Sequence, residues 1–258
     1  MLKKFQEFFQ NFLVWIYLLI TVPTFSIIAI IIRKHFFARL WCKGLLKILN
    51  IKIEIIKEKE LPKNIYVFMS NHQSQLDIPV LEKILEPYNI RFLAKKSLFK
   101  IPFFGWGIKA LGYVPVERKD PKEGLKSVLA CIEKLKKGIS LVIFPEGTRS
   151  HTGELLPFKL GGFVIPLKSK INVVPISIWG TRNILPKGAL WFRNPSNKKV
   201  WVYIGKPIEI KDLNNRDKER LAQMVRERIL KGLEIIKKNK ESTIINKNLG
   251  KDFYDKKD

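Results

Sequence analysis

Two side chains that could act together as a base lie five positions apart in the segment SNHQSQLD, residues 70–77. A tight turn could bring the Asp77 carboxylate onto one imidazole nitrogen of His72, which would fix the tautomer and leave the other nitrogen free to accept a proton. This is a serine-protease triad without its attacking hydroxyl, so the substrate would have to supply that group. Both residues also have structural alternatives, since Asp77 is a good helix N-cap and His72 could be an ordinary loop histidine.

A second polar cluster, PEGTRS at residues 145–150, follows an apolar run. A glycine among charged residues at a strand end is typical of a loop that approaches a ligand closely. Arg149 offers a planar fork suited to phosphate, and Lys159 adds a cation beside Gly161 and Gly162. The alternative is a surface turn in which Arg149 makes a solvated salt bridge.

Both clusters follow short runs rich in β-branched residues, and α/β sheets tend to place ligand-facing groups just past such strand ends. Helical patterns are clearest at 123–137 and 217–238. This alternation predicts an α/β fold with a mixed, largely parallel sheet flanked by helices. The predicted strands are 51–56, 65–69, 90–93, 113–116, 139–144, 173–178 and 199–204.

The N-terminal region predicts a membrane-embedded helical segment. Residues 12–32 carry no charge, and an apolar helix of about 20 residues can cross the hydrocarbon layer. A signal peptide is disfavoured because no small-residue cleavage site follows. Pro23 leaves a kink or a re-entrant pair of helices open, and cations at both ends leave the orientation undecided. Residues 33–49 suit either a helix in the headgroup region or one packed on the domain.

The 258 residues have room for one sizeable domain with a small appendage. We expect a membrane-anchoring helical segment at 1–50, an α/β domain at 51–238 and a loose, polar, Lys-rich tail at 239–258. The two cysteines, Cys42 and Cys131, have no disulfide-framework or metal-ligand spacing, which fits a reducing cytoplasmic setting. The segment 99–112 could be a core element or could insert shallowly into a membrane interface.

The formal net charge of +25 points to an anionic partner, which could be nucleic acid, anionic lipid or a phosphorylated substrate. A Lys-, Ile- and Asn-rich composition from AT-rich coding would explain part of this charge without any partner. The aromatic residues cluster in the N-terminal segment and at 99–106 rather than among the Lys-rich stretches. We therefore expect no nucleic-acid partner, because a stacking platform would need aromatic side chains beside the cations.

Four motifs together resemble the glycerolipid acyltransferase family, most closely the bacterial 1-acylglycerol-3-phosphate (lysophosphatidic acid) acyltransferases. They occur in the family's order and approximate spacing: NHQSQLD at 71–77, GYVPVER at 112–118, FPEGTRS at 144–150 and VVPI at 173–176. No P-loop, nucleophile elbow, dinucleotide fingerprint or metal cluster is recognisable, and the other histidines are His35 and His151.

The resemblance implies roles for individual residues. His72 would be the general base and Asp77 its orienting partner. Lys95 matches a family lysine, although Ser97 stands where a glutamate is common. Glu146 would either orient glycerol hydroxyls or hold the arginines in place. The remaining acceptor-binding residues implied are Gly147, Thr148 and Arg149 around the acyl acceptor, with Arg118 and Lys95 near its phosphate.

The implied reaction moves an acyl chain from acyl-CoA or acyl carrier protein to the sn-2 hydroxyl of 1-acylglycerol-3-phosphate, giving phosphatidic acid. It would need no metal and no cofactor besides the acyl donor. Membrane lipids would be partners, and the enzyme would lie at the cell inner membrane with its catalytic domain on the cytoplasmic side. Acylation of another lysophospholipid or amphipathic acceptor is an alternative, and a basic membrane-tethered binding protein is a remote one.

Overall fold

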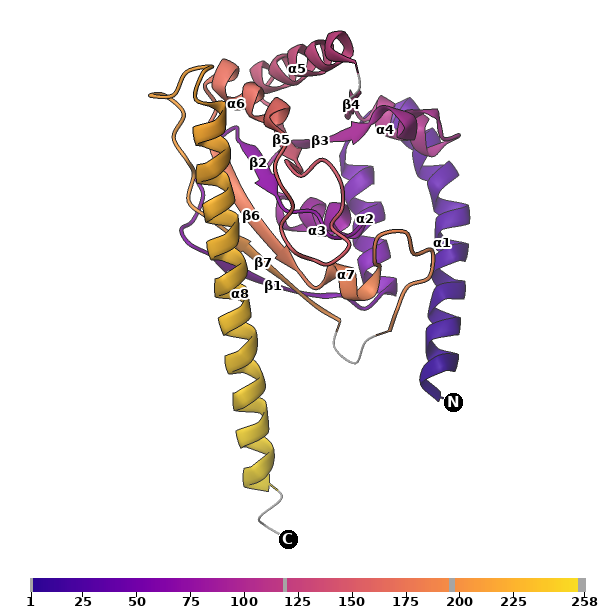
Figure 1. Ribbon diagram of the computed structural model, residues 1–258. Helices are drawn as coiled ribbons and strands as arrows, with labels where there is room; N and C mark the ends of the chain where they lie inside the picture. The colour runs from indigo at the N-terminus through magenta and orange to yellow at the C-terminus, as the bar shows by residue number, and fades with distance from the viewer. Residues whose placement is uncertain (1, 118–119, 195–197, 255–258) are drawn as a thin grey trace.

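A seven-stranded sheet organises the chain in the computed structural model, which describes residues 2–117, 120–194 and 198–254. Its strand order is β1-β7-β6-β2-β5-β3-β4 (Figure 1). All neighbouring strands are parallel except β6 and β7. The predicted mixed, largely parallel sheet is therefore confirmed, and each of its seven strands was expected. They are β1 (Lys52–Lys57), β2 (Val67–Ser70), β3 (Ile90–Lys95), β4 (Val114–Val116), β5 (Ser140–Ile143), β6 (Val173–Trp179) and β7 (Lys199–Ile204).

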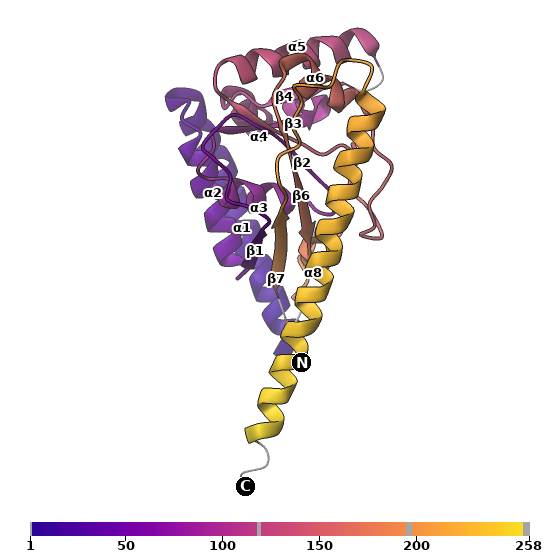
Figure 2. The ribbon, with the colours of Figure 1, turned by 90° about the vertical axis from the view of Figure 1, so that its left-hand side faces the viewer.

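Helices cover both faces of the sheet, as Figure 2 shows with the sheet nearly edge-on. On one side lie α1 (Leu2–Ile32), α2 (Phe36–Ile48) and α3 (Asp77–Ile84). On the other lie α5 (Pro121–Lys136), α6 (Val164–Ser169) and α8 (Lys218–Tyr254). The shorter elements are η1 (Lys96–Lys100), α4 (Phe104–Ala110), η2 (Leu160–Phe163) and α7 (Thr181–Ile184).

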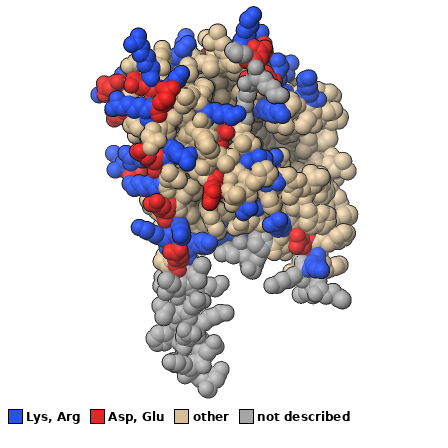
Figure 3. Space-filling view, viewed as in Figure 1, with Lys and Arg blue, Asp and Glu red and all other residues tan. Residues whose placement is uncertain are grey.

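Helix α1 continues through Pro23 to Ile32 rather than forming a re-entrant pair. Within the described residues, Lys4–Ile32 is the segment long and apolar enough to cross a membrane, and little of it is buried. The side of the molecule occupied by α1 is mostly tan in Figure 3, whereas charged side chains gather over the opposite half. The apolar face of α1 is therefore left without a protein partner over most of its length.

Helices α2 and α4 pack on the rest of the protein. Cys42, Leu45 and Leu46 of α2 are buried, and α2 lies against α3, which favours the packed alternative for residues 33–49. Helix α4 lies against α1, where a Cβ on Gly107 would come within 2.6 Å of Ser26 Oγ. Only glycine permits this approach. The segment 99–112 contributes Ile108 to the interior, whereas Trp106 is 50% exposed, and its insertion into a membrane interface stays a prediction.

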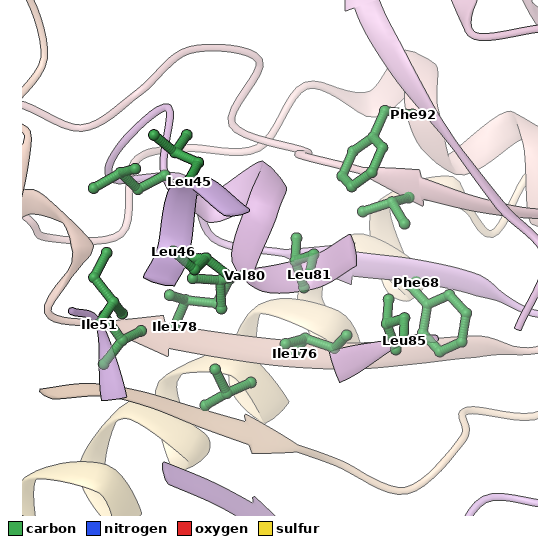
Figure 4. Packing of buried hydrophobic residues seen from close by; sticks show 14 of the residues in the cluster. Leu45, Leu46, Ile51, Phe68, Val80, Leu81, Leu85, Phe92, Ile176 and Ile178 are labelled. Carbon is green, nitrogen blue, oxygen red and sulfur yellow. The ribbon is translucent and has the colours of Figure 1, made fainter. Parts of the chain in front are cut away.

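The two faces of the sheet each have their own core. Successive residues of β2 alternate between them: Phe68 contributes to the cluster under α2 and α3, and Val67 and Met69 to the cluster under α5, α6 and α8. Central parallel strands that are buried on both faces therefore have nearly continuous apolar sequences. Figure 4 shows the first cluster, in which side chains of α2 and α3 meet Ile176 and Ile178 of β6.

The expectation of a loose tail from residue 239 is wrong as far as Tyr254, because α8 continues to that residue. Asn239 Nδ2 donates a hydrogen bond to Ile235 O, and Ser242 Oγ donates to Lys238 O. The polar, Lys-rich composition is therefore compatible with a helix, since straight-chain residues such as Lys and Glu lose little rotamer freedom there.

Candidate active site

The two polar motifs lie at the carboxyl ends of neighbouring parallel strands. His72 follows β2, and the segment 144–150 follows β5, which pairs with β2 through Val67–Met69 and Leu141–Ile143. Because parallel strands end at the same edge of a sheet, the two loops meet there. Gly147 makes the second loop possible: its φ is +70°, and its N–H donates to Phe144 O at 3.0 Å in a tight turn.

The expected contact between His72 and Asp77 is present, with 2.8 Å between His72 Nδ1 and Asp77 Oδ2. Asp77 is fully buried, whereas the His72 side chain is 15% exposed. Since Nδ1 donates to the carboxylate, Nε2 is the nitrogen that can act as an acceptor in the cavity that His72 lines. This geometry satisfies what a base that activates a substrate hydroxyl requires.

Asp77 does not cap α3. Leu76 occupies the N-cap position, and no side-chain cap hydrogen bond is formed there, so the N-cap alternative is wrong. The carboxylate turns back toward the preceding loop instead, where Oδ2 accepts from Gln73 N at 2.7 Å and Ser74 N at 2.9 Å. These two amide donors hold Oδ2, the same oxygen that faces His72 Nδ1.

A residue far along the chain donates a hydrogen bond to the other oxygen of the Asp77 carboxylate. Thr181 Oγ1 donates to Asp77 Oδ1 at 2.5 Å, and Thr181 is fully buried at the start of α7, just after β6. Sequence analysis missed Thr181, because 104 positions separate it from Asp77. The available signal was its place directly after an expected strand, in the segment that follows the VVPI motif.

The second motif holds His72 in place. Glu146 Oε1 accepts from His72 N at 2.6 Å, and Ser150 N donates to His72 O at 2.8 Å. The His72 ring stacks on Phe144 with 3.8 Å between centroids and an interplanar angle of 13°. Both backbone groups and one ring face of His72 are thus fixed by residues of the loop after β5.

Glu146 itself is not among the residues that line the cavity. It is 2% exposed, and its other oxygen, Oε2, accepts from Leu156 N at 2.8 Å. Burial raises the pKa of the Glu146 carboxyl to about 7, although the backbone N–H groups of Leu156 and His72 act in the opposite direction. These contacts tie the loop that carries Glu146 to the backbone at His72 and Leu156. The two roles implied by the family resemblance stay predictions.

A cavity of about 1050 Å³ opens beside His72. Its walls are largely apolar and come from α1, α2 and α4, including Val22, Phe25, Trp41 and Ile108. Polar side chains also line the cavity. They include His72, Lys95, Thr148, Arg149, Lys159 and Lys187, together with the acidic Glu117 and Asp120.

The predicted acceptor-binding residues differ in where the structure places them. Lys95 and Arg149 line the cavity, as do Gly147 and Thr148, so the structure brings these four together with His72. Arg118 lies outside the described residues. Lys187 is a cavity cation that sequence analysis missed, because an isolated lysine in a loop carries no signal in so basic a chain. Within the described part of the chain, His, Cys, Asp and Glu side chains form no group of three that could hold a metal ion.

Comparison with known proteins agrees with the motif pattern. The acyltransferase family model matches residues 52–179. A 1-acyl-sn-glycerol-3-phosphate acyltransferase of Borreliella burgdorferi is 30% identical over 199 residues, covering 77% of this chain and 76% of that protein. The chain belongs to the acyltransferase family.

Other members of the acyltransferase family differ in length. The chloroplastic 1-acyl-sn-glycerol-3-phosphate acyltransferases of Arabidopsis thaliana and Brassica napus are each 38% identical over 175 residues, or 67% of this chain. The chain spans about half the length of these curated relatives, 48% and 50%. The crystal structure of PlsC, the 1-acyl-sn-glycerophosphate acyltransferase of Thermotoga maritima, aligns with a TM-score of 0.73 at 26% identity, covering 91% of this chain and 98% of that one.

Proposed function

We propose that this acyltransferase transfers an acyl chain from an acyl thioester to the sn-2 hydroxyl of 1-acylglycerol-3-phosphate, forming phosphatidic acid. The observation that carries the proposal is the His72–Asp77 pair beside a large, mostly apolar cavity. An amphipathic acceptor and a long acyl chain both match a cavity with cationic side chains in its lining and largely apolar walls. The relatives bearing this activity in their names support the choice of acceptor.

The proposed chemistry begins with proton transfer. His72 Nε2 takes the proton of the acceptor hydroxyl as its oxygen attacks the thioester carbonyl carbon. Asp77 stabilises the imidazolium that forms, from 2.8 Å. The tetrahedral intermediate then collapses, the C–S bond breaks, and the thiolate takes the proton back from His72. The ester and a free thiol are the products, so atoms and charge balance without another reactant.

The cations in the cavity lining would neutralise the acceptor's phosphate monoester. Arg149 offers two parallel N–H donors, whereas Lys95, Lys159 and Lys187 are point charges that need no fixed geometry. We assign the phosphate chiefly to Arg149, with Lys95 and Arg118 as further contacts. Gly147 and Thr148 belong to this acceptor site by position, whereas Glu146 would act through the loop it holds.

The enzyme would take its acceptor from a bilayer. Helix α1 presents a long apolar face, and the same helix lines the cavity through Leu18, Val22 and Phe25. A lysophospholipid could therefore pass between membrane and site without crossing water. We propose residues 1–50 as the anchor, the cell inner membrane as the location with residues 51–238 on its cytoplasmic side, and acyl-CoA or acyl carrier protein as the donor.

The test is thiol release by the detergent-purified protein from acyl-CoA, with and without 1-acylglycerol-3-phosphate. Release that depends on the acceptor and falls by about 10²–10⁴-fold in His72→Ala is expected, because that range is typical of general base catalysis. Folding of the variant is checked by thermal denaturation. Acceptor-independent release, or full activity in His72→Ala, would contradict the proposal. If the protein acylated only a different lysolipid, that lipid would replace 1-acylglycerol-3-phosphate as the proposed acceptor. The role of His72 as the base would be unchanged.

A further inference from the structure

The loop between α7 and β7 is fastened to α1 by side-chain hydrogen bonds, among them those of Asn11 and one from Lys198 Nζ to Gln10 Oε1. Asn11 lies within α1 and is fully buried. Its Oδ1 accepts from Phe192 N at 2.7 Å, and its Nδ2 donates to Phe192 O, also at 2.7 Å. Both polar groups of Asn11 therefore pair with the backbone of a residue 181 positions away. Figure 1 shows this loop reaching across to α1.

Next to this joint the loop exposes two large apolar side chains. Leu190 is 75% exposed and Trp191 is 45% exposed. The Trp191 ring lies 6.2 Å, centroid to centroid, from the ring of Phe8, which is itself 58% exposed on α1. A single exposed leucine needs no explanation, but this pair extends the apolar face of α1 onto a second element.

Cations flank this apolar tip. Lys187 precedes it and lines the cavity, and Arg193 follows it on the surface. Apolar and aromatic side chains below cations match the layers of a bilayer surface, where acyl chains lie beneath anionic headgroups. The partner that fits both the apolar tip and its flanks is therefore a membrane with anionic lipid, continuous with the membrane that covers α1.

We infer that residues 186–193 form a second membrane-contacting element, in which Leu190 and Trp191 enter the bilayer beside α1 and Arg193 contacts an anionic headgroup. The inference rests on the proposed function in one respect, which is that the acyl acceptor comes from the membrane. The loop is also joined to the site: Leu185 O accepts from Ser74 Oγ at 2.7 Å, and Ser74 N donates to Asp77. Seating this loop on lipid would hold the cations of the cavity lining at the headgroup level.

A depth measurement tests the contact without any turnover. Cys42 and Cys131 are buried, so a thiol dye placed on Leu190→Cys reports that position. In vesicles of phosphatidylcholine and phosphatidylglycerol, nitroxide lipids should quench the dye and aqueous iodide should not. The control is Ile55→Cys on β1, where residue 55 is 46% exposed and should show the reverse. Equal iodide quenching at the two positions would overturn the inference.

A second quenching measurement tests the contact between Arg193 and an anionic headgroup. Nitroxide quenching at position 190 should be stronger when phosphatidylglycerol is present than in phosphatidylcholine alone, and Arg193→Gln should remove that difference. The same response in both vesicle types would remove Arg193 from the contact, leaving the apolar insertion to stand on the depth result.

An activity comparison measures the consequence. Leu190→Ser combined with Trp191→Ser should lower turnover of a vesicle-borne acceptor several-fold and leave turnover of a short-chain, monomeric acceptor unchanged. Ile55→Ser combined with Leu230→Ser, at two exposed apolar positions on β1 and α8, should change neither. Undiminished turnover on vesicles would contradict the role of the loop. A protein that transfers no acyl chain in either format would instead contradict the proposed function, while the dye result would still decide the membrane contact.

Discussion

The His72 imidazole is held at Nδ1 by Asp77, along one ring face by Phe144, and at its backbone by Glu146 and Ser150. Loss of rotamer freedom before reaction is what lets a positioned base act on a weak nucleophile such as a secondary alcohol. Asp77 is fixed in turn by two backbone amides and the Thr181 hydroxyl, which together with His72 offset the cost of burying a carboxylate.

Thr181 is therefore a positioning residue that can be tested. Thr181→Val keeps the volume but removes the donor to Asp77 Oδ1, and hydrogen bonds to charged groups contribute about 1.5–3 kcal/mol. We expect kcat to fall on the order of tenfold with unchanged KM for both substrates. Thr181→Ser, which retains the hydroxyl, should restore most of kcat. A Ser variant as slow as Val would show that Thr181 acts through packing rather than through its hydrogen bond.

Arg149 is predicted to serve binding rather than proton transfer. Arg149→Lys keeps the charge but loses the planar pair of donors, so KM for 1-acylglycerol-3-phosphate should rise about tenfold while kcat changes little. Steady-state kinetics with a monoacylglycerol acceptor provides the control, because that acceptor has no phosphate to lose. An unchanged KM for the phosphorylated acceptor would remove Arg149 from the phosphate site.

At the scale of elements, local patterns were sufficient to locate the strands and one contact of the candidate site. Apolar runs marked all seven strands, and His72 and Asp77 are close enough in sequence for a turn to join them. The contacts of Thr181 and Lys187 depend instead on strand order, since they reach the site only because β6 lies beside β2. Composition also misjudged the end of α8, where polar residues are compatible with both coil and helix.

Glu146 links the loops after β2 and β5, and its buried carboxyl predicts a pH dependence of stability. Its pKa is about 7 in the folded protein against 4.5 ordinarily, so the folded state favours the protonated form. The resulting stability is full below about pH 4.5 and is lost as the pH rises through 7. At roughly 1.4 kcal/mol per pKa unit, the change is about 3 kcal/mol.

Chemical denaturation of the wild type and Glu146→Gln across pH 4.5 to 8 would measure this. The Gln variant cannot ionise, so the free energy of unfolding of the wild type relative to the variant should decline with rising pH in that window. All other titrating groups are shared and cancel in the difference. Parallel stability curves for the two proteins would rule out a titrating Glu146.

At the scale of the whole molecule, the cavity belongs to no single part of the chain. The α/β domain supplies the base and the cations, whereas α1 and α2 supply much of the apolar wall. The same helix α1 turns one face to this cavity and another outward, with Val22 lining the space and Leu19 78% exposed. The helix proposed to anchor the protein would therefore also set how much acyl chain the cavity accommodates.

We therefore predict that α1 sets the acyl-chain preference. Val22→Trp should fill part of the cavity, so kcat/KM for long acyl donors should fall about tenfold relative to short ones, because each excluded CH₂ forfeits about 0.8 kcal/mol of burial. Leu19→Trp places the same ring on the outward face of the same helix and should leave the ratio unchanged. Competition between acyl donors of different length, read out by product composition, gives the ratio directly. If both variants shift it equally, the effect comes from membrane attachment, and the acyl chain does not bind beside α1.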